Sequence, residues 1–566
     1  MSKWVAVKSR SLFLLFIIAV LLLVSACSGN TDQKEANDKP QNGQSAQTEG
    51  TGGTEEGNAE QLDPLGRFDP PIELTVGRVT NPEFKFGEGE SIDKNVWTEL
   101  YESRLGIKVS NEFVVDSSQS AAKINVAIAA GEIPDLITVN NSQLQQLAEA
   151  GLLADMTEVL GKYGSEKTKE ILNADGGHML KSATIDGKLM AIPHSGAAID
   201  GTLMVWIRKD WLDNLNLPEP KTVDDILNIS KAFATQDPDK NGKNDTFGFE
   251  LRRDLFNDFA ALDGFLNMYN AYQSIWLKGA DGKLVYSSIQ PEMRAALQKL
   301  QEMFKAGEID KEFAVKDMGR AAESIASGKT GMFFGTMASA IYPLQDAHMK
   351  DKNALWQPYL LPSVGGGQAK VQIPAYFNLY YAVSSKVKHP EAAIKMLNIL
   401  HEKKYVEEDQ EYFLHNGLPR YWYPIVRGDG AKDNLEQHIA IVEAMKNKDT
   451  SKLTKGQLNT YNQVQSYFNG DENYWKMERI FGENGAFSIV NQYTNDMYVR
   501  DAFVGAPTET LIEKGATLST MIAQVFTKII MGAPIEEFDK LVADWNKLGG
   551  EKLTEEVNAW YASEVK

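Results

Sequence analysis

Strand and helix patterns follow one another along the chain after residue 70. Residues 72–77 alternate with the period of a half-buried strand, and residues 97–105 have the spacing of an amphipathic helix that ends at Gly106. The same order recurs, with further strands predicted at 107–115 and 134–139 and further helices at 121–130 and 143–150. Strand–helix–strand alternation at this spacing predicts parallel βαβ units in an open α/β sheet.

Helical patterns dominate the rest of the chain. Helices are predicted at 223–235, 291–306, 390–402, 437–446 and 534–548, and strands at 190–193, 331–334 and 380–383. Strands separated by long helical stretches predict two interleaved α/β lobes joined by a hinge, with more helix in the second. We expect residues 69–193 and about 335–400 in the first lobe, and 194–334 and about 401–566 in the second. The alternative is that the C-terminal helices return to the first lobe, and the sequence leaves both assignments open.

The N-terminal residues have the pattern of an export signal. Lys3, Lys8 and Arg10 precede an apolar run at 12–24, which is shorter than the roughly 20 residues of a membrane-spanning helix. This pattern predicts a secretory signal peptide over residues 1–26. The following Leu-Val-Ser-Ala-Cys sequence resembles the bacterial lipobox, whose cysteine becomes the lipid-carrying N-terminus of the mature protein, so we expect a lipid anchor on Cys27.

Residues 27–68 are expected to consist of the lipidated Cys27 followed by a disordered tether. The segment is rich in Gly, Ser, Gln, Asn and acidic residues, and it has too little apolar surface to offset the entropy of ordering. We therefore expect a folded body anchored at the extracellular face of the cell membrane, or in the periplasm of a cell with two membranes.

Composition narrows the possible functions. The 566 residues exceed the roughly 250–300 residues that one hydrophobic core can organise. With 58 basic and 77 acidic residues the net charge is −19, which disfavours nucleic acid as a partner. The single cysteine excludes an intramolecular disulfide and a thiolate zinc cluster within the chain. We expect a monomer.

Several weak motifs occur in a characteristic order. They are AAGEIPD at 129–135, IRKDWLD at 207–213, SGKTGM at 327–332, GAPT at 505–508 and GAP at 532–534. Their order resembles family 1 of the extracellular solute-binding proteins of bacterial ABC importers, especially its long lipoprotein branch for oligosaccharides. The resemblance covers nearly everything from residue 70 onward. It implies a type II periplasmic-binding-protein-like fold, an oligosaccharide ligand held between the lobes, ABC permease subunits as partners, and no catalytic activity.

One loop has the oxygen spacing of a calcium site. Side-chain oxygens stand at positions 1, 3, 5 and 9 and a glycine at position 6, as in the first nine positions of an EF-hand loop. The loop lacks the bidentate glutamate of an EF-hand and resembles the shorter loop of alginate-type binding proteins. An Asx-rich turn without an ion is the alternative. We expect a structural Ca²⁺ held by Asp237, Asp239, Asn241, Lys243 through its carbonyl, Asp245 and Thr246.

Strand ends and crossings between the lobes supply candidate ligand contacts. Ligands of open α/β sheets bind beyond the carboxyl ends of the strands. Trp276 is expected to stack on a sugar, and Arg78 to pair with a uronate if the sugar is acidic. The candidates are Arg78, Asn140, Asn141, His194, Ser195, Trp276, Tyr376 and Asn378.

Two alternatives to transport stay open at this point. The sequence has no P-loop, no HExxH and no GxSxG motif. A polysaccharide-active glycoside hydrolase or lyase would leave no such motif, because its two carboxylates can come from separate strands. A lipoprotein that binds a polymer for adhesion or regulation is the third possibility.

Overall fold

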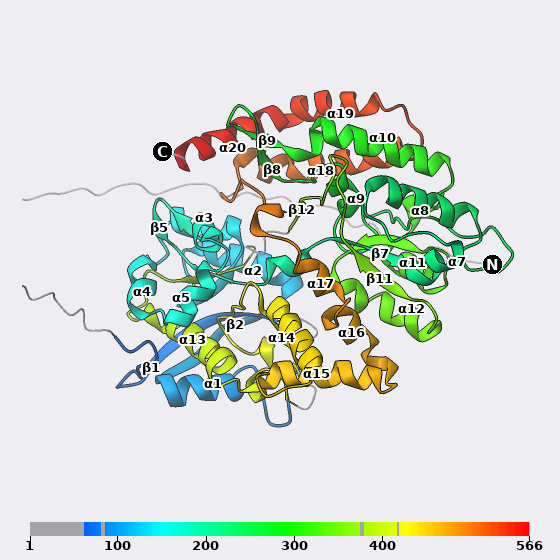
Figure 1. Ribbon diagram of the computed structural model, residues 1–566. Coiled ribbons are helices and arrows are strands. Elements are labelled where there is room, and N and C mark those ends of the chain that lie inside the picture. The colour runs from blue at the N-terminus through cyan, green and yellow to red at the C-terminus, as the bar shows by residue number, and fades with distance from the viewer. Residues whose placement is uncertain (1–61, 81–84, 374–378, 416–417, 506, 565–566) are drawn as a thin grey trace, which may run out of the picture. The chain divides into compact units, whose positions relative to one another are not determined.

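The computed structural model describes residues 62–80, 85–373, 379–415, 418–505 and 507–564 (Figure 1). The predicted signal peptide, Cys27 and nearly all of the expected tether therefore lie outside the described residues, as do Tyr376 and Asn378. Among the described helices, none combines the length and apolar character that crossing a bilayer requires. From Leu74 to Val557 the buried apolar side chains form two separate cores.

The first core surrounds a five-stranded sheet. Its strand order is β2-β1-β3-β13-β6. β1 pairs in parallel with both β2 and β3, as the alternation predicted, whereas β13 runs antiparallel to β3 and β6. The strands are β1 (Ile72–Thr80), β2 (Ile107–Asp116), β3 (Leu136–Val139), β6 (Ile192–Pro193) and β13 (Tyr380–Val383).

Helices next to this sheet begin and end where local signals place them. The first helix runs as α1 (Val96–Leu100) into a π-helical turn, and Gly106 ends it with a φ of 67°, a conformation that favours glycine. Asn140 caps α3 through a hydrogen bond from Gln143 N to its Oδ1 at 2.9 Å. The described helices here are α1, α2 (Ser117–Ala130), α3 (Asn141–Glu149), α4 (Thr157–Tyr163), α5 (Glu166–Asn173), α6 (His178–Ser182) and α13 (Glu391–His401), with a hairpin of β4 (Thr184–Ile185) and β5 (Lys188–Leu189).

The second core contains a three-stranded antiparallel sheet in the order β10-β7-β11. Its central strand β7 is buried at every position, which is why its sequence shows no alternation. The strands are β7 (Met204–Arg208), β10 (Met332–Gly335) and β11 (Trp356–Tyr359). Two smaller pairs join β8 (Trp276–Lys278) to β9 (Leu284–Tyr286) and β12 (Val371–Gln372) to β14 (Tyr498–Val499).

Many helices enclose the second core, and α10, α18 and α19 lie side by side in Figure 1. The longest described helix, α18, was not predicted. The helices are α7 (Lys209–Leu215), α8 (Val223–Thr235), α9 (Asp263–Met268), α10 (Pro291–Lys305), α11 (Met318–Ala326), α12 (Leu344–Lys350), α14 (Asp433–Asn447), α15 (Lys455–Phe468), α16 (Trp475–Phe481), α17 (Ala486–Val490), α18 (Glu509–Ile530), α19 (Glu537–Trp545) and α20 (Glu551–Glu564).

The placement of several segments differs from the expected lobe boundaries. Residues 335–373 belong to the second core, because β11 pairs with β7 and brings Trp356 with it. Residues 401–426 continue in the first core, where Tyr423 and Val426 are fully buried. The C-terminal helices α18 to α20 pack in the second core.

Three passages of the chain connect the two cores. The first lies between Ile192 and Ile199, the second between Ile373 and Tyr380, and the third between Val426 and Ile441. Residues 374–378 of the second passage are not described. Multiple short connections of this kind are where a two-lobed protein can hinge.

Candidate functional site

A cavity lies where two strands of the first sheet end. β1 ends at Thr80 and β3 at Val139, and both residues line a space of about 310 Å³. We call this cavity the arginine pocket, because Arg78 and Arg427 also line it. Its position agrees with the rule that ligands of open α/β sheets bind beyond the carboxyl ends of the strands.

Arg78 is held firmly in this pocket. It is 5% exposed, and its Nη2 donates to the carbonyl oxygen of Tyr423 at 2.9 Å. The Tyr423 hydroxyl in turn donates to the carbonyl oxygen of Lys85 at 2.8 Å. Burial lowers the pKa of Arg78 to about 10, so its guanidinium stays protonated at neutral pH.

A second cavity, of about 570 Å³, adjoins the arginine pocket and shares Leu379, Trp422 and Arg427 with it. Each of the three passages contributes to its wall: His194 from the first, Leu379 from the second and residues 427–429 from the third. We call it the junction pocket. The wall of this pocket therefore includes residues of all three passages that connect the two cores.

His194 and Tyr381 form a polar pair at the boundary of these two pockets. His194 Nδ1 and the Tyr381 hydroxyl oxygen lie 2.8 Å apart and share a hydrogen bond. Burial, and then the positive charge of Arg427, lower the pKa of His194 to about 4. His194 is therefore a neutral hydrogen-bonding group at pH 7. Burial raises the pKa of Tyr381, which keeps its hydroxyl protonated.

Aromatic side chains near residue 420 were missed by the sequence analysis. Trp422 lines both pockets, and Tyr421, which is 46% exposed, lines the junction pocket. The guanidinium carbon of Arg427 lies 4.9 Å from the centroid of the Trp422 ring. A signal existed in the run Arg-Tyr-Trp-Tyr-Pro at 420–424, which is aromatic yet has no strand or helix period.

A third cavity, of about 500 Å³, shares Lys404, Gln410 and Asp429 with the junction pocket. We call it the acidic pocket, because its lining includes Asp200, Glu408, Asp429, Asp433 and Glu436. Lys404 Nζ pairs with Asp429 at 2.6 Å and with Asp433 at 2.8 Å. The junction pocket therefore shares lining residues with both of the other pockets, and the charged side chains change from arginines in the arginine pocket to carboxylates in the acidic pocket. We call the three pockets together the cleft.

The cleft lacks a clear catalytic pair at its basic end. Over the described residues, the lining of the arginine and junction pockets contains one carboxylate, Asp429. Glycoside hydrolysis generally uses two carboxyl groups that flank the scissile bond. Burial raises the pKa of Asp200 in the acidic pocket to about 6, where Asn434 Nδ2 donates to its carboxylate at 2.6 Å.

The structure brings some of the expected ligand residues together and separates others. Arg78 and Asn140 line the arginine pocket and His194 the junction pocket. Asn141 lines none of the three pockets; its Nδ2 donates to the carbonyl oxygen of Gly505 at 3.3 Å. Ser195 is fully buried beneath the third passage, whose Asp429 N donates to the Ser195 carbonyl oxygen at 3.1 Å.

Trp276 is a core residue, contrary to the expected stacking role. It is 3% exposed, and its ring packs 5.2 Å from that of Tyr286. Its backbone N–H donates to Asp501 Oδ1 at 2.9 Å. A ring covered in this way offers no face to a ligand.

Polar atoms of the expected calcium loop converge, and Gly242 has the φ of 79° that its sharp turn requires. Asn241 Nδ2 donates to Asp239 Oδ2 at 2.7 Å and to Asp245 Oδ1 at 3.1 Å. The backbone N–H of Gly242 donates to Asp237 Oδ2 at 3.0 Å. Burial and the neighbouring Asp237 raise the pKa of Asp239, as expected for crowded carboxylates.

Other residues of this loop face elsewhere. The hydroxyl of Thr246 is buried and donates to the Phe233 carbonyl oxygen at 2.7 Å, at the end of α8. A Cβ at Gly248, the twelfth position, would lie 2.1 Å from the Ser230 carbonyl oxygen, so no glutamate fits there. Among the described residues no three Asp, Glu, His or Cys side chains gather closely enough to hold a metal. An ion in this loop therefore requires amide and carbonyl oxygens as well as carboxylates.

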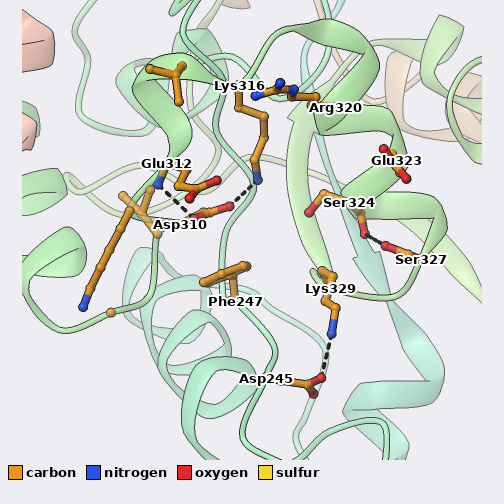
Figure 2. A pocket seen from close by; sticks show the side chains of 14 residues that line it. Asp245, Phe247, Asp310, Glu312, Lys316, Arg320, Glu323, Ser324, Ser327 and Lys329 are labelled. Carbon is orange, nitrogen blue, oxygen red and sulfur yellow. Dashed lines mark hydrogen bonds and ion pairs between the residues drawn. The ribbon is translucent and has the colours of Figure 1, made fainter.

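A further cavity, of about 740 Å³, adjoins this loop (Figure 2). Figure 2 shows Lys316 reaching Asp310, at 2.7 Å, and Lys329 reaching Asp245, at 2.6 Å. Lys316 Nζ also pairs with the fully buried Glu250 at 2.6 Å. Because these charged groups already pair with one another, we do not assign the ligand to this cavity, which we call the side pocket.

Comparison with known protein families matches residues 85–407, more than half of the chain, to the bacterial extracellular solute-binding proteins. The chain belongs to this family. The match supports the solute-binding fold and the extracellular location expected from the sequence.

Two curated relatives come from Bacillus subtilis. The polygalacturonan/rhamnogalacturonan-binding protein YtcQ is 26% identical over 448 residues, which cover 77% of this chain and 82% of YtcQ. Lipoprotein LipO is 25% identical over 487 residues, which cover 83% of this chain and 89% of LipO.

Solved structures confirm the two-lobed α/β fold. An HMO binding ABC-transporter associated solute binding protein from Bifidobacterium longum infantis aligns with a TM-score of 0.58 and 20% identity, covering 87% of this chain and 98% of that one. Alginate-binding protein AlgQ2 without calcium ion aligns at 0.55 with 16% identity, covering 88% and 100%. An EF-hand mutant of Streptococcus pneumoniae FusA in complex with fructo-nystose aligns at 0.53 with 17% identity, covering 87% and 99%.

Proposed function

We propose that the protein captures an oligosaccharide in the cleft between its lobes and delivers it to the permease subunits of an ABC importer. The main support is the cleft itself, where aromatic and planar polar side chains surround the junction pocket. Such groups recognise the C–H faces and hydroxyls of sugars. Family membership and the glycan-binding relatives YtcQ and FusA point the same way.

Ligand binding would close the hinge in this proposal. His194, Leu379 and Arg427 stand on different passages, so a sugar that contacts all of them favours one arrangement of the lobes. The test is isothermal titration calorimetry of the full-length protein in detergent against a panel of oligosaccharides, followed by small-angle scattering with any binder. Tight binding with compaction supports the proposal, and tight binding without compaction refutes the closing step.

The same samples distinguish binding from catalysis. A binding protein raises its melting temperature with the glycan while the glycan stays intact. A hydrolase produces new reducing ends, and a lyase produces unsaturated ends. Release of either product by the wild-type protein, and not by a heat-inactivated sample, would replace the transport proposal with an enzymatic one.

Anchoring through a lipid on Cys27 is part of the proposal. The lipobox-like sequence and the lipoprotein relative LipO support it. The variant Cys27→Ala should leave the membrane fraction of the expressing cells and appear in the medium or the periplasmic fraction. Retention of this variant on membranes would contradict the anchor.

The last part of the proposal is a structural calcium ion in the loop of residues 237–245. Ca²⁺ prefers oxygen ligands, and the carboxylates of Asp237, Asp239 and Asp245 lie around the Asn241 side chain. Asn241 now presents its Nδ2 to Asp239 and Asp245, so its amide would have to turn its oxygen toward the ion, with the Lys243 carbonyl as a further ligand. The EF-hand named for FusA supports the assignment. The ion would join the end of α8 to the following segment.

A further inference from the structure

The arginine pocket differs in charge from the rest of the molecule. The chain carries 77 acidic and 58 basic residues, yet the described residues that line this pocket include two arginines and no aspartate or glutamate. His194, at its boundary, is neutral at pH 7. The pocket therefore has a local positive charge inside an acidic protein, and this charge is concentrated on Arg78 and Arg427.

Arg427 is the arginine available to a ligand. It is half-buried, lines both the arginine and the junction pockets, and forms hydrogen bonds with Tyr381, but it has no salt bridge to any residue that the structure describes. Its guanidinium is positioned over the Trp422 ring at 4.9 Å. A planar guanidinium fixed in this way matches a carboxylate with two parallel hydrogen bonds.

We propose, on the basis of the proposed function, that the arginine pocket binds the carboxylate of a uronic acid unit and that Arg427 selects acidic over neutral sugars. The net charge of −19 disfavours an acidic ligand only mildly here, because charges beyond about 8 Å are largely screened at physiological salt and two arginines lie in the pocket itself. The five carboxylates of the acidic pocket would repel a uronate, which carries a charge of the same sign. They therefore favour the orientation of the ligand in which its uronate lies in the arginine pocket.

The test uses ligands that differ only in charge. Trimers of galacturonate and of mannuronate, each beside its fully methyl-esterified form, are titrated into the full-length protein by calorimetry. At least one acid trimer should bind 10-fold or more tighter than its ester. Arg427→Gln should weaken that acid roughly 10- to 100-fold, as expected for a lost charge-assisted hydrogen bond, and the ester less than 3-fold. Arg427→Lys should give an intermediate affinity.

Arg479→Gln is the matched control, because Arg479 also lies over an aromatic ring, that of Trp475 at 6.0 Å, and lines none of the three pockets. It should change neither affinity. Equal binding of acid and ester, or equal weakening of both by Arg427→Gln, overturns acid selection while oligosaccharide capture stands. Binding of neutral oligosaccharides but of no acidic one also overturns acid selection, and oligosaccharide capture again stands. Binding of no oligosaccharide in the wider panel overturns both proposals.

Discussion

Lys329 is expected to weaken calcium binding by the proposed calcium loop, and the size of this effect can be measured. Lys329 Nζ lies 2.6 Å from Asp245 Oδ2, so the ammonium group competes with a metal for that carboxylate. The backbone fixes this geometry, because the N–H of Phe247 donates to the Lys329 carbonyl oxygen at 2.7 Å. Lys329→Met should therefore free Asp245 and tighten calcium binding.

The exposure of the pair sets the size of the effect. The two side chains are 44% and 35% exposed, and exposed ion pairs are worth about 0.2–1 kcal/mol. Removing the competitor should tighten binding by roughly 1.5- to 5-fold. At a calcium concentration 100 times the Kd, the ion should stabilise the protein by about 2.7 kcal/mol.

Calorimetry with calcium and thermal melts in calcium or chelator measure both quantities. Lys243→Met is the matched control: it removes one positive charge from the loop itself, but the Lys243 side chain is exposed, forms no salt bridge with a described residue and acts on Asp245 only at longer range. A control that tightens binding as much as Lys329→Met would show that net charge, not the Asp245 contact, sets the affinity. Identical melting in chelator and in calcium would exclude the ion altogether.

Three further predictions concern the site and the fold. Trp422→Ala should weaken oligosaccharide binding about 10-fold in calorimetry, whereas Trp276→Phe, a change in the core, should not; equal losses would contradict the placement of the site. Lys316→Met leaves the buried Glu250 without its cationic partner, with only the Ser324 hydroxyl still donating to it, and should cost about 3–5 kcal/mol in denaturant unfolding; adding Glu250→Gln should recover most of this loss. Burial lowers the pKa of His401 to about 4 from 6.5, so the neutral form stabilises the fold above pH 6.5 and that stability is lost as the pH falls. Between pH 7 and 4.5 the contribution of His401 to this loss should be about 2–3 kcal/mol, and His401→Gln should remove that share; an unchanged pH profile would contradict this cause.

Local signals were enough to predict much of the first lobe. The helix at 223–235, in the second lobe, was also predicted with the bounds observed for α8, because Thr222 caps it and its apolar residues have helical spacing. Gly106 and Gly242 have the positive φ that their positions required. These features depend on residues a few positions apart, and such distances are visible in a sequence.

Contacts between distant residues explain what could not be predicted. Trp276 has polar neighbours in sequence, but Asp501, 225 positions later, is the residue that bonds to its backbone and helps to enclose it. Residues 335–373 were expected in the first lobe, because the sequence did not reveal that β11 pairs with β7 of the second core. The cleft depends on the same kind of contact, since Arg78 is fixed by Tyr423, 345 positions away.

Residues of the passages between the lobes line the junction pocket, so under the proposed function a ligand bound there can affect how the permease recognises the protein. A permease must distinguish a loaded protein from an empty one without reading the ligand directly, and the arrangement of the lobes can supply that information. A ligand shifts such an equilibrium only by its difference in affinity for the two arrangements. Because His194, Leu379 and Arg427 lie on the passages themselves, a contact made there changes with every hinge movement, whereas a contact confined to Thr80 or Asn140 does not. Arg427 would therefore couple recognition of the ligand to closure of the lobes.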